Sequence, residues 1–144
     1  MTIRDWLEGL SYKLVQGSLD VEVNEVVYDS RKAAPGAVFV CMKGTKIDSH
    51  DFVGQVTDAG VKVLVTEHAV EAPADVTVVE TANGREALAL LSAARFGYPS
   101  RKLTMIGVTG TKGKTTTTHM IKTILETAGK KTGMIGTNGV YIGE

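Results

Sequence analysis

The 144-residue chain has little cysteine, few aromatic residues, no net charge and no long apolar run. Its one cysteine, Cys41, excludes an internal disulfide, and its place in the apolar run 37–42 is typical of a buried thiol. Sixteen basic and sixteen acidic residues cancel, so the composition gives no reason to expect nucleic acid or a membrane surface as a partner. Residues 1–6 lack the apolar core of a secretion signal, and no apolar run approaches ~20 residues, so we expect a cytoplasmic protein without a membrane-spanning segment.

Apolar runs of strand length alternate with helical patterns along the N-terminal part of the chain. The strand-like runs are residues 21–27, 37–42, 61–65 and 76–79, and the helical patterns are residues 5–10, 50–60 and 83–96. Strands separated by helices are typical of an α/β fold, and the run 37–42, apolar at every position, predicts a strand buried on both faces. We place a domain boundary between residues 81 and 82, with the helix 83–96 leading into a second unit.

The most informative segment is the glycine-rich stretch that follows. An apolar run, residues 103–108, leads into Gly-Thr-Lys-Gly at residues 110–113, and residues 114–128 then show a helical pattern. A strand, a glycine loop and a helix together cradle a polyphosphate, because glycines let backbone N–H groups turn toward the anion. In such a loop Lys114 would reach the β- and γ-phosphates, and the Thr115 hydroxyl would bind Mg²⁺.

The match to the general phosphate-loop pattern is incomplete, because Val108 stands where that pattern has its first glycine. The shorter string Gly-Thr-Lys-Gly-Lys-Thr-Thr, at residues 110–116, therefore carries the prediction. The alternative is an ordinary glycine- and threonine-rich loop, which the strand–helix context disfavours. One further apolar run follows at residues 132–135, whereas a nucleotide-binding α/β domain needs ~100–200 residues. We therefore expect the chain to be part of a longer protein.

Two polar clusters flank the predicted strand at residues 37–42. Asp-Ser-Arg, at residues 29–31, precedes the strand, and Asp-Ser-His, at residues 48–50, follows it. Serine and histidine can hydrogen-bond a base or a diphosphate, and arginine can bind a phosphate through two N–H groups. The plainer interpretation is a helix cap at Asp48 or Ser49 and a solvated turn at residues 29–31, and the residues alone favour it.

Taken together and in order, these stretches resemble the Mur ligases, and most of all the MurE branch, which adds the third residue of the peptide. The matching stretches are residues 29–31, 35–40, 44, 48–52 and 107–116. The resemblance implies an α/β fold: a small N-terminal domain, residues 1–81, that binds UDP-MurNAc-dipeptide, and a second part, residues 82–144. That part would hold the linker helix and the first βα unit of a P-loop-type, ATP-binding central domain. Two positions depart from the family pattern, where Ser49 replaces the usual glycine and Lys112 the commoner asparagine.

The resemblance also implies an activity, the ATP-dependent formation of an amide bond. A diamino acid, L-lysine or meso-diaminopimelate, would be joined to UDP-MurNAc-L-Ala-D-Glu in peptidoglycan precursor synthesis, with Mg²⁺ as the cofactor. Ser30 is the best match to the family's UDP-contacting serine, and Arg31 and His50 would lie nearby. The implied ATP-binding residues are Gly110, Thr111, Lys112, Gly113, Lys114, Thr115 and Thr116, with Thr115 also the metal ligand. No catalytic residue is expected within residues 1–144, so the chain by itself is expected to be an inactive monomer.

Two other interpretations remain open from the sequence. The chain could be a non-catalytic module that binds a UDP sugar or a nucleotide. It could also belong to another phosphate-loop protein, such as a folylpolyglutamate synthetase or an ATPase whose sheet a partner completes. A generic ATPase has no need of the clusters at residues 29–31 and 48–50, which counts against the ATPase. His68 and His119 are interpreted as surface or packing residues, because neither has a partner at the spacing of metal ligands.

Overall fold

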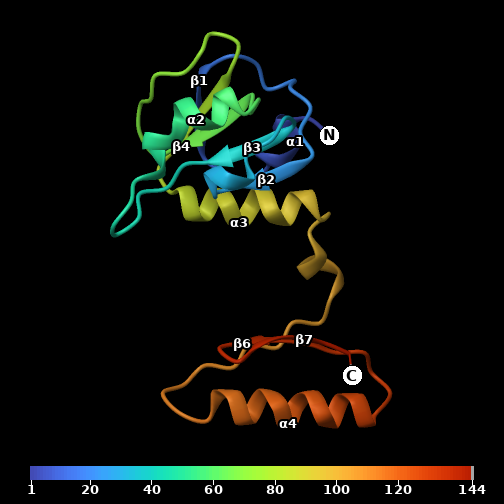
Figure 1. The fold of residues 1–144 in the computed structure, drawn as a ribbon. Helices are drawn as coiled ribbons and strands as arrows, with labels where there is room; N and C mark the ends of the chain where they lie inside the picture. Colours follow the sequence, from blue (N-terminus) through green and yellow to red (C-terminus); the bar gives the residue numbers. More distant parts are fainter. Residues whose placement is uncertain (144) are drawn as a thin grey trace. The chain divides into compact units, whose positions relative to one another are not determined.

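The structure, a computed structural model, describes residues 1–143. It divides into two compact units, Met1–Lys102 and Leu103–Glu144, which are described separately below (Figure 1). Within the described residues, no helix is both long and apolar enough to cross a lipid bilayer.

The first unit is built on a five-stranded mixed sheet. Its strands are β1 (Tyr12–Gln16), β2 (Glu25–Val27), β3 (Ala37–Val40), β4 (Val63–Thr66) and β5 (Thr77–Thr81). The order across the sheet is β1-β5-β4-β3-β2, in which β2 to β5 run parallel and β1 pairs with β5 in the antiparallel direction. The sequence pattern predicts β2 to β5 but not β1, whose side chains lie mostly exposed at the sheet edge.

Helices cover both faces of this sheet, which makes the unit a three-layer α/β fold (Figure 1). The short helix α1 (Ile3–Trp6) and the long helix α3 (Gly84–Arg95) pack on one face, and α2 (Val53–Asp58) packs on the other. Val38 and Val40 belong to the core under α1 and α3, while Phe39 and Cys41 belong to the core under α2. Every residue of β3 is buried, which confirms the prediction of a strand with two apolar faces. The α/β class is therefore the one that the sequence predicted.

Cys41, just after β3, is fully buried and free. Burial, together with the nearby carboxylates of Asp48 and Glu67, raises the pKa of its thiol to about 12. Desolvation disfavours the thiolate, which is the reactive form. The prediction of a buried, unreactive thiol is confirmed.

Interactions between residues close in the sequence set both ends of helix α3. The side chain of Asn83 accepts hydrogen bonds from the backbone N–H groups of Arg85 and Glu86, at 3.0 and 3.2 Å. This cap satisfies two of the N–H groups that have no partner inside a helix. The helix stops before Gly97, whose φ of 67° lies in the left-handed region.

Helix α3 belongs to the first unit by its packing. Its buried stripe is Gly84, Ala87, Leu91 and Ala94, and Arg95 forms an ion pair of 2.6 Å with Glu25 of β2. Gly84 is required for this packing, since a Cβ there would lie 2.7 Å from the carbonyl oxygen of Cys41. Along the chain, the first compact unit ends at Lys102, so the boundary that we placed between residues 81 and 82 falls inside the first unit. The division of functions between the two parts remains a prediction.

The second unit consists of one helix and one hairpin. Helix α4 (Lys114–Thr127) confirms the predicted helix, and the strand β6 (Gly133–Gly136) confirms the apolar run at residues 132–135. A two-residue loop then leads to β7 (Gly139–Ile142), which pairs with β6 in the antiparallel direction. The only buried apolar residue in the described part of this unit is Met134.

The strand predicted at residues 103–108 is wrong, because the structure has irregular backbone there. Leu103, Met105 and Ile106 are 63%, 69% and 55% exposed. A strand is held by hydrogen bonds to a neighbouring strand, and in the described part of this unit β6 and β7 pair with each other. An apolar run that has strand propensity but no neighbour does not form a ladder.

Candidate functional site

An open hollow of about 600 Å³ lies at the carboxyl edge of the first unit's sheet. We call it the carboxyl-edge hollow. Its lining residues are Tyr28, Asp29, Ser30, Arg31, Met42, Gly44, Ile47, Ser49, Phe52 and Arg85. These residues come from the segments after β2 and β3 and from the first turn of α3. Ligands of parallel α/β sheets bind outside the carboxyl ends of the strands, so the hollow lies where a ligand is expected.

The Asp-Ser-Arg cluster forms a short capped turn on the wall of this hollow. Asp29 caps the 3₁₀ turn Ser30–Lys32 by accepting a hydrogen bond from the Arg31 backbone N–H at 3.1 Å. The Arg31 guanidinium also binds the Asp29 carboxylate through Nε and Nη2, at 2.9 and 2.6 Å. Hydrogen bonds from Arg31 lower the pKa of Asp29 to about 2. The predicted turn is confirmed, and Ser30 and Arg31 also lie on the hollow, with the Arg31 side chain 85% exposed.

The Asp-Ser-His cluster forms a second capped turn, the 3₁₀ helix Ser49–Phe52. Asp48 is its cap and accepts a hydrogen bond from the His50 backbone N–H at 3.0 Å, which confirms the predicted cap. Ser49 binds the backbone of Met42 twice: its Oγ accepts from the N–H at 2.6 Å and donates to the carbonyl at 2.9 Å. Serine at a position where the family usually has glycine therefore fastens this loop to the end of β3.

His50 is buried, and both of its ring nitrogens already have partners. Nε2 accepts a hydrogen bond from the Glu67 backbone N–H at 2.9 Å, and Nδ1 lies 2.5 Å from Asp48 Oδ1. Because Nε2 is the acceptor, Nδ1 carries the proton and donates it to Asp48. His50 does not line the carboxyl-edge hollow. A contact between His50 and a uridine nucleotide remains a prediction. In the structure, His50 connects the segments that contain Asp48 and Glu67.

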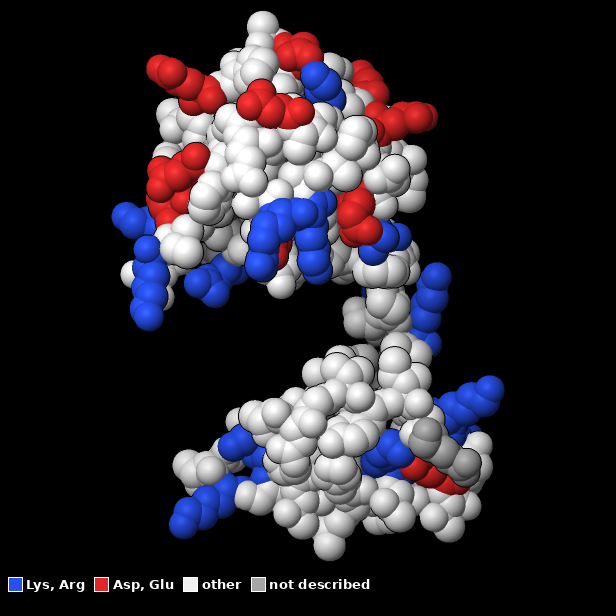
Figure 2. All heavy atoms as spheres, in the orientation of Figure 1, with Lys and Arg blue, Asp and Glu red and all other residues white. Residues whose placement is uncertain are grey.

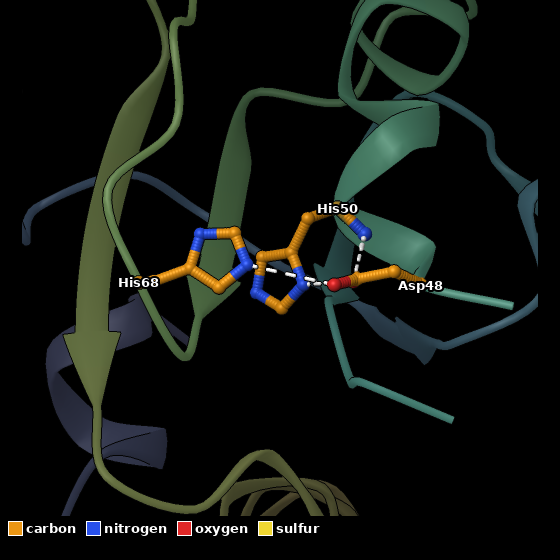
Figure 3. Close-up of side chains that lie close together, drawn as sticks. All are labelled: Asp48, His50 and His68. Atoms are coloured by element: carbon orange, nitrogen blue, oxygen red, sulfur yellow. Dashed lines mark hydrogen bonds and ion pairs between the residues drawn. The ribbon is translucent and has the colours of Figure 1, made fainter. Parts of the chain in front are cut away.

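His68 stacks on His50, with ring centroids 3.9 Å apart, and its Nε2 lies 3.6 Å from Asp48 Oδ2 (Figure 3). Asp48, His50 and His68 therefore form a group whose candidate ligand atoms lie within 4.8 Å of one another. A metal ion on His50 Nδ1 would have to replace the proton given to Asp48. Nε2 would then become protonated and face the Glu67 N–H, donor against donor. This tautomer explains the group as a packing and hydrogen-bonding cluster. The structure nevertheless brings His68 beside two candidate ligands that its spacing along the chain did not indicate.

Glu67 is a site residue that the sequence analysis missed. Its carboxylate accepts hydrogen bonds from the backbone N–H groups of Lys43, at 2.9 Å, and Gly84, at 2.8 Å. Burial raises the pKa of Glu67, but these two hydrogen bonds outweigh it and the pKa is lowered overall. Its partners lie 17 and 24 residues away along the chain, so no local spacing points to them. The available signal is an acidic residue directly after a buried strand, at the edge where ligands bind.

The second candidate site is the glycine loop at residues 110–113 and the first turn of α4. Gly113 is the N-cap of α4 in a left-handed conformation, with φ 76°, and no side chain caps the helix. The first N–H groups of a 14-residue helix are therefore left for another acceptor, and the helix dipole favours an anion there. Lys114 Nζ lies 2.5 Å from the Gly110 carbonyl, folded back over the loop. All seven residues predicted to bind ATP lie in this loop and helix turn.

The same turn can supply part of a magnesium site. Thr115 lies in the first turn of α4 and offers a hydroxyl oxygen. Mg²⁺ is usually held by one or two carboxylates together with substrate phosphates and water. The one carboxylate in the described part of the second unit, Glu126, forms an ion pair with Lys122 at 2.6 Å, which lowers its pKa. Thr115 therefore fits as a single ligand to an ion that arrives with the phosphates.

Two family descriptions match the chain, each within one of the two compact units. Residues 22–96 match "Mur ligase family, catalytic domain", and residues 108–144 match "Mur ligase middle domain". The first match spans more than half of the chain, and the chain belongs to the Mur ligase family. The resemblance that the sequence analysis stated is therefore confirmed.

Two relatives resemble the chain along nearly its full length. UDP-N-acetylmuramoyl-L-alanyl-D-glutamate–2,6-diaminopimelate ligase of Clostridium perfringens is 43% identical over 99% of this chain and 30% of its own length. The corresponding L-lysine ligase of Staphylococcus haemolyticus is 40% identical over 100% of this chain and 29% of its own. The chain thus spans about 30% of the length of these relatives. The chain is thus nearly equally identical to a diaminopimelate ligase and to an L-lysine ligase.

Solved structures of the same family share the fold. A MurF structure from Acinetobacter baumannii has a TM-score of 0.68 and 31% identity, covering 88% of this chain and 27% of that one. MurF ligase from Thermotoga maritima in complex with ADP has a TM-score of 0.54 and 26% identity, covering 73% of this chain and 24% of that one. These likenesses confirm the predicted fold class.

Proposed function

We propose that the chain forms the substrate-binding and phosphate-binding part of an ATP-dependent ligase. This ligase joins a diamino acid to UDP-MurNAc-L-Ala-D-Glu in the cytoplasm. The observation that carries the proposal is the combination of two sites in one chain. One is a hollow at the carboxyl edge of the first unit that Ser30 and two arginines line, and the other is an uncapped helix after a glycine loop in the second unit. Identities of 40–43% to ligases of this kind, over nearly the whole chain, support it.

In the proposed reaction, the D-Glu carboxylate of the substrate attacks the γ-phosphate of ATP and releases ADP. The amine of the diamino acid then attacks the resulting acyl phosphate, phosphate leaves, and the amide forms. The glycine loop contributes backbone N–H groups and the positive end of α4 to the ATP phosphates. Lys114 would leave the Gly110 carbonyl and bind the β- and γ-phosphates, where it offsets the negative charge that shifts during transfer. Bound through Thr115, Mg²⁺ would supply further charge neutralisation at the phosphates.

The first unit would hold the nucleotide end of the other substrate. Ser30 lies on the wall of the carboxyl-edge hollow, and Arg31 and Arg85 line the same space. Two arginines suit a diphosphate, because each can bind oxygen atoms through paired N–H groups. Selection between lysine and diaminopimelate is left to parts of the protein outside this chain, in agreement with its similar identity to both kinds of relative.

The test uses the full-length protein and measures phosphate release that depends on ATP, the UDP dipeptide and a diamino acid. Lys114→Ala should lower turnover by about 10²-fold or more, because one charged group at the reacting phosphates is lost. Lys131→Ala, at an exposed lysine outside the loop and α4, serves as the matched control and should leave turnover nearly unchanged. Normal turnover in the Lys114 variant would refute the proposed phosphate site.

The hollow is tested separately. In the full-length protein, Ser30→Ala should weaken binding of the UDP dipeptide and leave ATP binding unchanged, as measured by titration calorimetry. Ser18→Ala is a suitable control, because Ser18 is an exposed serine that does not line the hollow. Equal affinities for the UDP dipeptide in the wild type and the Ser30 variant would remove Ser30 from the site.

A further inference from the structure

Glu67 connects three segments that meet at the carboxyl-edge hollow. Its Oε1 accepts from the backbone N–H of Gly84 at 2.8 Å, and its Oε2 accepts from the backbone N–H of Lys43 at 2.9 Å. Its own backbone N–H donates to Nε2 of the buried His50 at 2.9 Å. One residue after β4 is thus bonded to the loop after β3, to the turn Ser49–Phe52 and to the start of α3.

Each of these contacts lies next to a residue that lines the hollow. Lys43 precedes Gly44, Gly84 precedes Arg85, and His50 follows Ser49. Both oxygens of the carboxylate are used, and backbone N–H groups bind an ionised acceptor more strongly than a neutral one. The bond to Gly84 also adds to the cap of α3, where Asn83 binds the next two N–H groups, and a negative charge is favoured at that end of a helix. Glu67 therefore fixes the backbone directly beside the lining groups.

We infer that Glu67 is a positioning residue for the UDP substrate, and that it acts through Arg85. This inference rests on the proposed function. By holding the first residue of α3, Glu67 sets where the Arg85 guanidinium enters the hollow that Ser30 and Arg31 also line. By holding Lys43, it fixes the start of the loop at residues 43–48 beside the same space. A site whose walls are ordered before binding loses less freedom when the ligand arrives, so its affinity is higher.

The test compares Glu67→Gln and Glu67→Asp in the full-length ligase. Glutamine keeps the size of the side chain but has one acceptor oxygen, so its amide N–H groups face a backbone N–H. We expect Glu67→Gln to raise KM for the UDP dipeptide by roughly tenfold, with kcat and KM for ATP nearly unchanged. Glu67→Asp, which keeps two acceptors on a shorter stem, should recover part of the loss. Glu71→Gln, at an exposed acidic residue away from the hollow, is the matched control.

A second arm separates positioning from general stability. If Glu67 acts through Arg85, Arg85→Ala should raise the same KM, and the double variant should lose less than the product of the two single effects. An unchanged KM for the UDP dipeptide in Glu67→Gln would overturn the inference. So would a parallel rise in KM for both substrates together with a lower melting temperature, since that pattern marks a structural role only. A wild-type protein that does not turn over the UDP dipeptide would overturn the proposed function itself, and the inference with it.

Discussion

Both compact units contain apolar segments, but the first unit buries most of its apolar side chains and the second leaves most of its own exposed. In the first unit, strands β3 and β4 are buried at every position, between helices on both faces. In the described part of the second unit, Met134 is the only buried apolar residue, and Ile135 and Ile142 are 82% and 84% exposed. An apolar pattern becomes a core only where other elements cover it, because the hydrophobic effect scales with the area removed from water.

The two units also differ in charge. Residues 1–102 contain eleven basic and fourteen acidic residues, whereas residues 103–144 contain five lysines and two glutamates. The neutral whole therefore divides into an acidic unit and a basic one, and Figure 2 shows acidic side chains spread over the first unit. A basic unit suits the proposed ATP-binding role, since a positive local field attracts polyphosphates. The composition of the complete chain concealed this difference.

The largest expected difference between the two units is in hydrogen exchange of the 144-residue chain. Backbone N–H groups of β3, β4 and β5 should be the most protected, because they exchange through the largest openings. Residues 103–113 should exchange with little protection, because they lie in irregular, exposed backbone. Mass spectrometry of peptides after a time course of labelling provides the measurement. Equal protection in the two units would contradict the comparison.

The next largest effect is expected from a pair of substitutions, one in the core of the first unit and one at an exposed position of the second. Phe39→Ala should lower the free energy of unfolding of the first unit by ~3–5 kcal/mol, because a fully buried ring is removed. Ile135→Ala in β6 should change stability by less than ~0.5 kcal/mol, because that side chain is exposed. Chemical denaturation followed by circular dichroism reports both values. Comparable losses would show that the second unit has a core of its own.

Substitutions at two glycines test how far the stability of the first unit depends on close packing. Gly84→Ala should cost ~1–3 kcal/mol, because its Cβ would lie 2.7 Å from a backbone oxygen and force α3 away from the sheet. Gly54→Ala, in helix α2 with no atom near its Cβ, should be neutral or stabilising by up to ~1 kcal/mol. Thermal melts of both variants distinguish them. A stable Gly84 variant would mean that α3 packs less closely than the structure shows.

The smallest expected effect is a dependence of the first unit's stability on acid pH. The pKa of Asp48 is lowered to about 2 by its hydrogen bonds from His50. A carboxyl whose folded pKa is below its unfolded value of ~3.9 stabilises the fold at higher pH, and this contribution is lost as the pH falls from about 4 to about 2. Asp48→Asn should flatten this part of the pH profile of the melting temperature. A profile identical to that of the wild type would contradict the Asp48–His50 bond.

Much of the first unit was predictable because its signals are local. The unbroken apolar run at residues 37–42 and the helical pattern at residues 83–96 are both local, and both gave the correct element. Polar turns at residues 29–31 and 48–50 were predicted for the same reason. The strand β1 was missed, since its exposed side chains carry no burial pattern. The predicted strand at residues 103–108 failed, since a strand needs a partner that no local pattern supplies.

By itself the sequence determined which segments are apolar, where helices are capped, and that a glycine loop precedes α4. These properties depend on neighbours along the chain. Only the tertiary structure decided that His50 uses both ring nitrogens inside the protein and that Glu67 bonds to Lys43 and Gly84. The reason is physical: a hydrogen bond between residues 17 or 24 positions apart exists only after the sheet has brought their strand ends together.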